Sequence, residues 1–186
     1  MDEWLIGTSR VRLLRGDITQ QQVDAIVNAA NSTLLGGGGV DGAIHRVGGP
    51  DILADCKRLR ASLYPEGLPA GQAVSTTAGA LPAQRVIHTV GPIWRGGGAG
   101  ERDLLASAYR TVLERARAEG LRTVAFPSIS TGAYGYPVTA AAAVAVGTVQ
   151  EQLQAHGDAF DEVRFVLFSA ADLQTYRSEV KRQSGT

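Results

Sequence analysis

A carboxylate and an amide flank four consecutive glycines in the first quarter of the chain. Asn31 precedes glycines 36–39, and Asp41 follows them after a single valine. Glycines leave backbone N–H groups accessible and allow a ligand to approach the main chain closely, which suits a pyrophosphate at a helix N-terminus. A negative group beside an anion site weakens anion binding. The position of Asp41 therefore indicates chemistry in addition to binding.

The glycine run differs from the common phosphate-binding loops. No Lys-Ser or Lys-Thr pair follows it, as a Walker A loop requires, and its spacing is not Gly-x-Gly-x-x-Gly. These differences argue against a nucleotide-dependent transferase and a dinucleotide-dependent dehydrogenase.

A second polar loop occupies residues 128–136, directly after an apolar stretch at 123–126. It is rich in serine, threonine and glycine, and it contains Tyr134 and Tyr136. Hydroxyls and free amides can bind an anion, and an aromatic ring can pack on a sugar. Alone, this segment reads more easily as an ordinary loop, but beside the glycine run it predicts a partner that clamps a pyrophosphate from the other side.

The histidines and the single cysteine carry weaker signals. His45 follows Asp41 by four residues, so it either orients that carboxylate or packs, and packing is the favoured interpretation. His88 lies in an apolar strand and is expected in the core, and Cys56 is expected to pack within a helix. His156 suits the C-terminus of a helix. We find no spacing typical of a metal site and no Gly-x-Ser-x-Gly elbow.

Composition limits the possible partners. The 186 residues are expected to form one domain spanning 1–186, and 18 Lys+Arg balance 18 Asp+Glu. Zero net charge argues against sequence-specific nucleic-acid binding, which needs clustered positive charge. One cysteine excludes an internal disulfide and fits a reducing compartment. With no apolar run long enough for a membrane segment and no signal-like start, a cytoplasmic location is expected.

Short apolar stretches alternate with stretches of helical periodicity along the chain, which predicts an α/β sandwich with a mixed, mostly parallel sheet covered on both faces. Ligands bind such sheets at the carboxyl ends of strands. Residues 16–19, 28–42, 127–137 and 168–169 follow predicted strands, so we expect them to line one cleft. Asp17 in the first of these segments serves equally well as a turn residue or a ligand contact. Strands are expected at 11–14, 23–27, 73–77, 85–90, 123–126 and 163–168, and helices at 43–47, 52–63, 101–119, 138–153 and 172–182.

Several of these segments together resemble the macrodomain family, in particular its MacroD-type branch. The resemblance spans nearly the whole chain, and its motifs occur in the family's order. Small departures occur at residues 47–49, where alanines are more usual, and at Ala80, where an aromatic residue is common. The motifs are Gly-Asp-Ile-Thr at 16–19, Val-Asp-Ala-Ile-Val-Asn-Ala-Ala-Asn at 23–31, the glycine run with Ala-Ile-His-Arg at 34–46, Val-Ile-His-Thr-Val-Gly-Pro at 86–92, and residues 126–137.

The resemblance implies a three-layer α/β/α sandwich that binds ADP-ribose. Asp17 would accept a hydrogen bond from the adenine amino group, with the Ile18 backbone beside it, and Phe168 would stack on adenine. Asn31 and Asp41 would face the distal ribose, where MacroD-type members cleave an ester of ADP-ribose. Backbone amides of two loops would enclose the diphosphate, and Tyr134 would also pack on the distal ribose; these loops comprise Gly37, Gly38, Gly39, Val40, Ser130, Thr131, Gly132, Ala133 and Tyr134.

The sequence therefore predicts a monomeric hydrolase that acts on O-acetyl-ADP-ribose and on proteins mono-ADP-ribosylated at Asp or Glu. Asp41 would activate or orient a water molecule, and Asn31 would position the ribose hydroxyls or the water. The expected reaction requires no metal and no organic cofactor. The alternative is a non-catalytic module that binds ADP-ribosylated proteins, because many macrodomains only bind. The Asn31–Asp41 pair favours the hydrolase.

Overall fold

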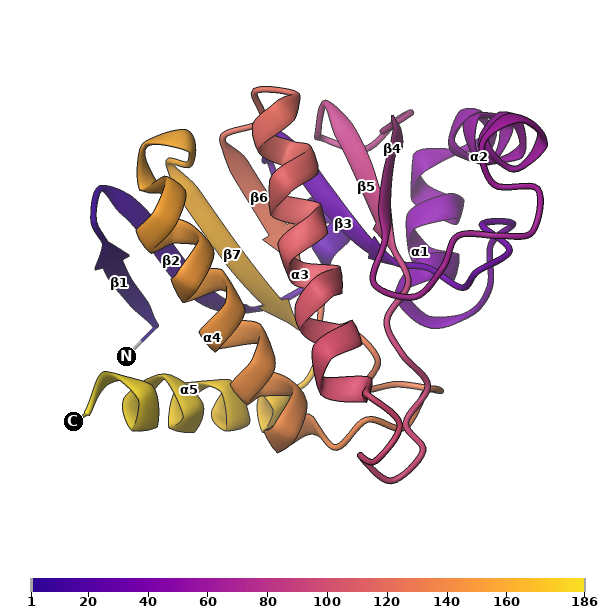
Figure 1. The fold of residues 1–186 in the computed structure, drawn as a ribbon. Helices are drawn as coiled ribbons and strands as arrows, with labels where there is room; N and C mark the ends of the chain where they lie inside the picture. The colour runs from indigo at the N-terminus through magenta and orange to yellow at the C-terminus, as the bar shows by residue number, and fades with distance from the viewer. Residues whose placement is uncertain (1, 186) are drawn as a thin grey trace.

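A seven-stranded sheet separates two layers of helices (Figure 1). The structure, a computed structural model, describes residues 2–185. The strands lie side by side in the order β1-β2-β7-β6-β3-β5-β4. They comprise β1 (Glu3–Ile6), β2 (Ser9–Arg15), β3 (Ala25–Ala29), β4 (Ala73–Thr77), β5 (Arg85–Thr89), β6 (Thr123–Phe126) and β7 (Glu162–Leu167). The helices are α1 (Gly39–Gly48), α2 (Pro50–Ser62), α3 (Glu101–Ala118), α4 (Val138–His156) and α5 (Ala170–Ser184).

The five central strands are parallel, whereas β1 and β4 pair antiparallel at the two edges. After β3 the chain continues toward β5 and β4 on one side, and after β6 it continues toward β7 on the other. The direction of winding therefore reverses between β3 and β6. Such a reversal is where open α/β sheets bind ligands. Ladder pairing between these two strands ends at Ile26 and Ala125, although β3 runs on to Ala29, so the strands diverge toward their carboxyl ends.

Successive side chains of β3 point alternately into two separate hydrophobic cores. Ala25 and Val27 belong to the core beneath α3, α4 and α5, whereas Ile26 belongs to the core beneath α1 and α2. A strand that is apolar on both sides is what a sheet buried on both faces requires. The predicted three-layer α/β/α fold with a mixed, mostly parallel sheet is confirmed.

The predicted element boundaries were accurate where apolar patterning was strong. The stretches 73–77 and 123–126 coincide with β4 and β6, and β4 pairs directly with β5. Strand β1 was not predicted, because its residues are only half-buried or exposed and an edge strand with little burial leaves no apolar pattern. Alanines 140–143 lie within α4, and none of the helices within residues 2–185 is long and apolar enough to cross a membrane.

Helix α1 begins at Gly39, four residues before its predicted start at residue 43. The expectation was wrong because glycine is a poor helix former, whereas here the glycines form the helix start itself. Gly38 is the N-cap and Gly42 N donates to Gly38 O at 3.2 Å. A Cβ on Gly42 would lie 2.6 Å from Gly37 O, so only glycine permits this close return of the loop. Asp41 therefore lies in the first helical turn.

Candidate functional site

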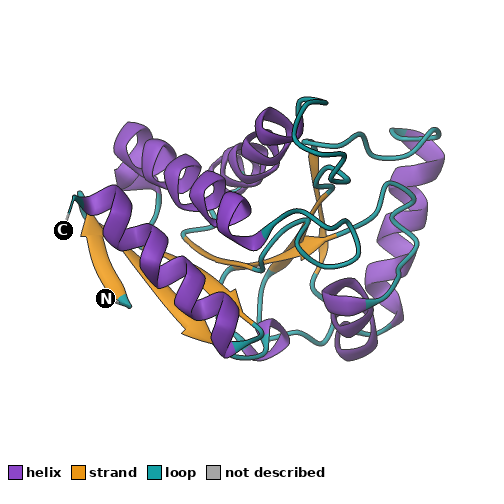
Figure 2. Cartoon of the chain, turned by 90° about the horizontal axis from the view of Figure 1, so that it is seen from below, coloured by secondary structure: helices purple, strands orange, loops and turns teal. Residues whose placement is uncertain are grey.

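The four segments expected to converge follow neighbouring strands. Across the sheet, β2, β7, β6 and β3 are adjacent and parallel, so their carboxyl ends share one edge. Asp17, Phe168, the loop at 127–137 and the loop at 30–38 follow these strands in that spatial order. Figure 2 shows the molecule from below, where loops cross the middle of the view between the helices. A ligand on this edge would meet Asp17 and Phe168 at one end and Asp41 at the other.

Asp17 caps the short 3-10 helix η1 (Ile18–Gln20) at the end of β2. Its Oδ1 atom accepts hydrogen bonds from Thr19 N at 2.9 Å and Thr19 Oγ1 at 2.7 Å. The structure thus shows the turn role that the Asp-x-Thr pattern predicted. Oδ1 accepts both hydrogen bonds, so Oδ2 of this exposed carboxylate is free to accept one from a ligand. Ile18 is buried and anchors the turn.

Phe168 directly follows β7 and is 88% exposed. The predicted strand at 163–168 in fact ends at Leu167, which leaves Phe168 outside the ladder. The next residue, Ser169, caps α5 by accepting from Asp172 N at 3.0 Å. The backbone of Phe168 is therefore fixed between β7 and α5, while its ring remains in water. A large aromatic side chain in this state is available to stack on a planar ligand.

The glycine loop presents unused backbone donors. Among the described residues, the N–H groups of Gly37, Gly38, Gly39 and Val40 donate to no protein acceptor outside helix α1, and the first N–H groups of a helix have no partner within it. Gly37, Gly38 and Gly39 are exposed. Added to the positive end of the helix dipole, these donors make the start of α1 suitable for an anion.

Asn31 and Asp41 come together beside Gly37. A methyl group built on Gly37 would lie 3.1 Å from Asp41 Oδ2 and 3.2 Å from Asn31 Nδ2. The Asn31 amide also shapes the loop, because Nδ2 donates to Gly36 O at 3.0 Å and Oδ1 accepts from the backbone and hydroxyl of Thr33. The structure thus brings the two predicted catalytic groups to one place; their roles stay predictions.

The second loop also exposes backbone donors. Among residues 2–185, the N–H groups of Thr131, Gly132, Ala133 and Tyr134 have no hydrogen-bond acceptor in the protein. The loop is fixed from below, since Tyr136 N donates to Ser130 O at 2.9 Å, and Tyr136 itself is buried. An ordered loop with free donors is the arrangement expected of an anion-binding segment.

Ser130 holds the most unusual backbone conformation in this loop. Its φ is +67°, it is buried, and its Oγ lacks a hydrogen-bond partner among the described residues. Gly91 makes room for it, because a Cβ on Gly91 would lie 2.1 Å from Ser130 Oγ. A left-handed non-glycine residue with an unpaired buried hydroxyl costs stability, and such strain is concentrated at functional sites.

The carboxylate of Asp41 is buried, with 5% of the residue exposed, and it has two partners inside the protein. Asn28 Nδ2 donates to Asp41 Oδ1 at 2.8 Å, and His45 Nε2 lies 3.3 Å from the same oxygen. His45 therefore contacts Asp41, and its role in orienting that carboxylate, the less favoured of the two interpretations, stays a prediction. Asn28 was not among the predicted site residues, although a polar residue in a buried strand must find a partner.

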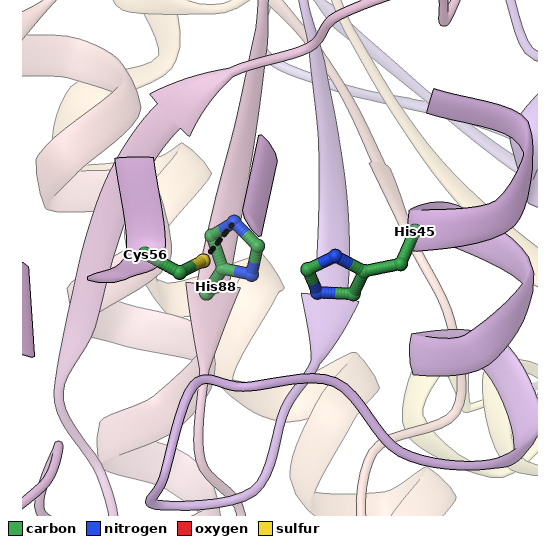
Figure 3. Close-up of side chains that lie close together, drawn as sticks. All are labelled: His45, Cys56 and His88. Atoms are coloured by element: carbon green, nitrogen blue, oxygen red, sulfur yellow. Dashed lines mark hydrogen bonds between the residues drawn. The ribbon is translucent and has the colours of Figure 1, made fainter. Parts of the chain in front are cut away.

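His88 is fully buried, as expected, and burial lowers its pKa to about 3, with His45 adding a smaller effect in the same direction. His45, Cys56 and His88 lie close together on α1, α2 and β5 (Figure 3), with their ligand-type atoms within 4.8 Å of one another. Sequence spacing gave no sign of this grouping, because the three residues come from three elements. Burial, followed by the charge of Asp41, raises the pKa of the Cys56 thiol to about 11, so the thiol is protonated.

An open surface hollow lies at the opposite edge of the sheet. Its lining includes Gln22, Asp24, Pro82, Gln84 and Thr123, which precede or begin β3, β5 and β6. It shares no residue with the predicted site. The strand-end loops, and not this hollow, collect the groups capable of chemistry.

The fold and the two donor-rich loops define a macrodomain architecture, and the comparisons agree. The family described as Macro domain matches residues 27–145. The chain belongs to the macro domain family.

Relatives and solved structures support this assignment over nearly the whole chain. A macro domain-containing protein of Streptomyces griseus is 62% identical over 86% of this chain and 88% of its own. A protein of Citrobacter koseri named O-acetyl-ADP-ribose deacetylase is 53% identical over 94% of this chain and 97% of its own. A variant of the Oceanobacillus iheyensis macrodomain, solved with ADPR, is 40% identical and superposes with a TM-score of 0.94, covering 99% of this chain and 98% of that one.

Proposed function

We propose that this macrodomain binds ADP-ribose and hydrolyses its ester bond to acetate or to an Asp or Glu side chain of a protein. The observation that carries the proposal is the meeting of Asp41 Oδ2 and Asn31 Nδ2 beside Gly37, between two loops of free amides. The similarity to a protein named O-acetyl-ADP-ribose deacetylase supports the acetyl ester as one substrate.

The order of the strands suggests how the ligand lies. Adenine would contact Asp17 and stack on Phe168, which follow the adjacent strands β2 and β7. The diphosphate would lie at the divergence of β6 and β3, where the free amides of both loops would donate to it. The distal ribose would then reach Tyr134, Asn31 and Asp41. The ADPR in the Oceanobacillus iheyensis structure supports this choice of ligand.

The chemistry consumes one water molecule. Water adds to the carbonyl carbon of the ester, the bond from that carbon to the ribose oxygen breaks, and the products are a carboxylic acid and ADP-ribose. Asp41 aims or activates the water through Oδ2, and Asn31 holds the ribose hydroxyls or the water beside it. A positioned acid–base group contributes about 10²–10⁴-fold to such a reaction.

The test compares hydrolysis with binding. The native protein should release ADP-ribose from a protein mono-ADP-ribosylated on Glu and acetate from O-acetyl-ADP-ribose, both followed by mass spectrometry. Asp41→Ala should lower the rate by about 10²-fold or more with little change in affinity measured by calorimetry. Asp51→Ala is the matched control, because it removes an exposed first-turn carboxylate from the next helix. Tight binding without release by the native protein would instead identify a non-catalytic reader.

A further inference from the structure

A network of buried polar groups contacts Asp41 from the protein interior, on the side away from Gly37. Asn28 Nδ2 lies 2.8 Å from Asp41 Oδ1 and 3.0 Å from His88 Nδ1. His88 Nε2 lies 2.8 Å from Thr76 Oγ1, which donates to Thr77 O at 3.0 Å. Asn28 and His88 are paired in register on β3 and β5, and Thr76 lies on the next strand, β4. This network of hydrogen bonds therefore spans three strands, β3, β5 and β4, on the face of the sheet covered by α1 and α2.

The hydrogen bonds have a single consistent direction. The Asn28 NH₂ donates one hydrogen to Asp41 Oδ1, and its second hydrogen points to His88. His88 Nδ1 is then the acceptor and its proton resides on Nε2, from which it donates to Thr76. Low pKa keeps the ring neutral, which this arrangement requires. Asn28 Oδ1 is buried without a partner among residues 2–185, so Asn28 serves this network through its two donors.

Cys56 contacts the buried end of this hydrogen-bonded network. Its Sγ lies 3.8 Å from His88 Nε2, as the dashed line in Figure 3 shows. A metal ion held by His45, Cys56 and His88 would need a lone pair on a His88 ring nitrogen. In the hydrogen-bonded network Nδ1 accepts from Asn28 and Nε2 donates to Thr76, so both nitrogens are engaged. The hydrogen bonds thus favour an orienting role for this cluster over metal binding.

The network acts unequally on the two oxygens of Asp41. Oδ1 faces Asn28 and His45, whereas Oδ2 lies beside Gly37 and Asn31 on the ligand side. We propose that His88 is a positioning residue: through Asn28 it holds Asp41 with Oδ1 engaged inside the protein and Oδ2 presented to the substrate water. This inference rests on the proposed hydrolysis. The orientation of Asp41 that His88 sets is required for hydrolysis but not for binding of ADP-ribose.

The first test reads the hydrogen-bond chain without using activity. Long-range ¹H–¹⁵N NMR of the native protein should show neutral His88 with its proton on Nε2 from about pH 5 to pH 8. A proton on Nδ1 would overturn the proposal, because Nδ1 could not accept from Asn28. Crystal structures of two variants extend the test. Asp41 should keep its contact with Asn28 in His88→Asn, whose side-chain oxygen can replace Nδ1, and should rotate in His88→Leu, which has no acceptor.

The second test measures turnover. His88→Leu should lower kcat by about 10- to 100-fold, as misplacement of a reacting group does, with the affinity for ADP-ribose within about twofold of native. His88→Asn should recover most of that loss. Thr76→Val removes the group that fixes the ring and should give a smaller loss of kcat, whereas Thr148→Val, a buried threonine on α4, should leave kcat unchanged.

A double-variant comparison separates positioning from general damage. If His88 acts through Asp41, His88→Leu should have no further effect on kcat once Asp41 is alanine. An equal loss in both backgrounds, or parallel losses of kcat and affinity, would overturn the proposal. If the native protein proves to lack hydrolase activity, the proposed function fails on that measurement. The NMR and crystal structures would still decide whether His88 sets the orientation of Asp41.

Discussion

Phe168 is a large aromatic residue that gains almost no stabilisation from burial in the free protein. Its ring is 88% exposed, although burying a phenylalanine typically stabilises a protein by about 1.5–3 kcal/mol. We expect Phe168→Ala to weaken ADP-ribose binding by about 1–3 kcal/mol, the usual value of aromatic–base stacking, and to leave thermal stability nearly unchanged. Calorimetry measures the first and a melting curve the second. Phe168→Tyr keeps the ring and should bind like the native protein; unchanged affinity in the alanine variant would place adenine elsewhere.

Gly38 tests the predicted position of the diphosphate. A Cβ at this residue would meet nothing within 4 Å, and its φ of −94° suits any side chain, so Gly38→Glu should fold normally. The added carboxylate would lie at the start of α1, where it takes the space and opposes the charge of the diphosphate. We expect calorimetry to detect no ADP-ribose binding.

The matched control for this change is Gly157→Glu, between α4 and β7 at the amino edge of the sheet. Its φ is −63°, and a Cβ there would come only within ordinary contact distance of Ser9 Oγ and Ile6 O, so Gly157→Glu adds the same charge away from the predicted site. It should bind ADP-ribose as tightly as the native protein. Equal loss of binding in both variants would show that net charge, rather than the glycine loop, controls affinity.

At the scale of elements, one buried carboxylate organises the loop that leads into α3. Glu101 accepts hydrogen bonds from the backbone of Gly97 at 2.7 Å, Ala99 at 2.6 Å and Arg95 at 3.1 Å. Burial acts to raise its pKa, but these backbone donors outweigh burial, so the pKa is lowered from its ordinary value of 4.5. The adjacent Trp94 N donates to Tyr134 O at 2.8 Å, which links this loop to the predicted diphosphate loop.

The lowered pKa predicts a pH dependence of stability. The unfolded chain takes up a proton at Glu101 at higher pH than the folded protein does. The stabilisation that ionised Glu101 gives the folded protein is therefore complete above about pH 4.5 and is lost as the pH falls through the pKa of Glu101 in the folded protein. Glu101→Gln should lower the melting temperature at pH 7 and make it less sensitive to acid below pH 4.5. Glu114→Gln, on the exposed side of α3, is the control and should change neither. If the melting temperatures of the native protein and of Glu101→Gln fell by the same amount as the pH was lowered through this range, the assignment would be contradicted.

Sequence patterning predicted those elements whose burial produces a clear periodicity. The strand at 123–126 is apolar on both faces and was located without error, whereas the start of α1 was not, because glycines carry no helical signal. The glycine loop and Asp41 were recognisable from residue types alone. The chain Asn28–His88–Thr76 was not, since each member is an isolated polar residue whose partner lies on another strand. Only the register of β3, β5 and β4 brings them together.

At the scale of the whole molecule, the site depends on the order of the strands. The predicted adenine, diphosphate and ribose contacts follow β2, β7, β6 and β3, which are neighbours in the sheet although they are far apart in the chain. Reversal of the winding between β3 and β6 separates the loops that follow these strands, and the predicted diphosphate donors lie in these two loops. The parallel sheet was predictable from its apolar strands, but this order was not, because short parallel strands have no local pairing signal.

Ligand binding across several strand ends should stabilise the whole fold. ADP-ribose that binds only the native state at 100 times its Kd should add about 2.7 kcal/mol, by mass action. For a protein of this size, about 1 kcal/mol corresponds to about 2–4 °C, so the melting temperature should rise by about 5–11 °C. At the same ligand concentration the rise should be smaller in Phe168→Ala and close to zero in Gly38→Glu, because both bind more weakly. Asp41→Ala should keep the full rise while losing hydrolysis, since its carboxylate opposes the diphosphate rather than holding it. A rise of the same size in Gly38→Glu as in the native protein would mean that ADP-ribose binds outside the carboxyl edge of the sheet.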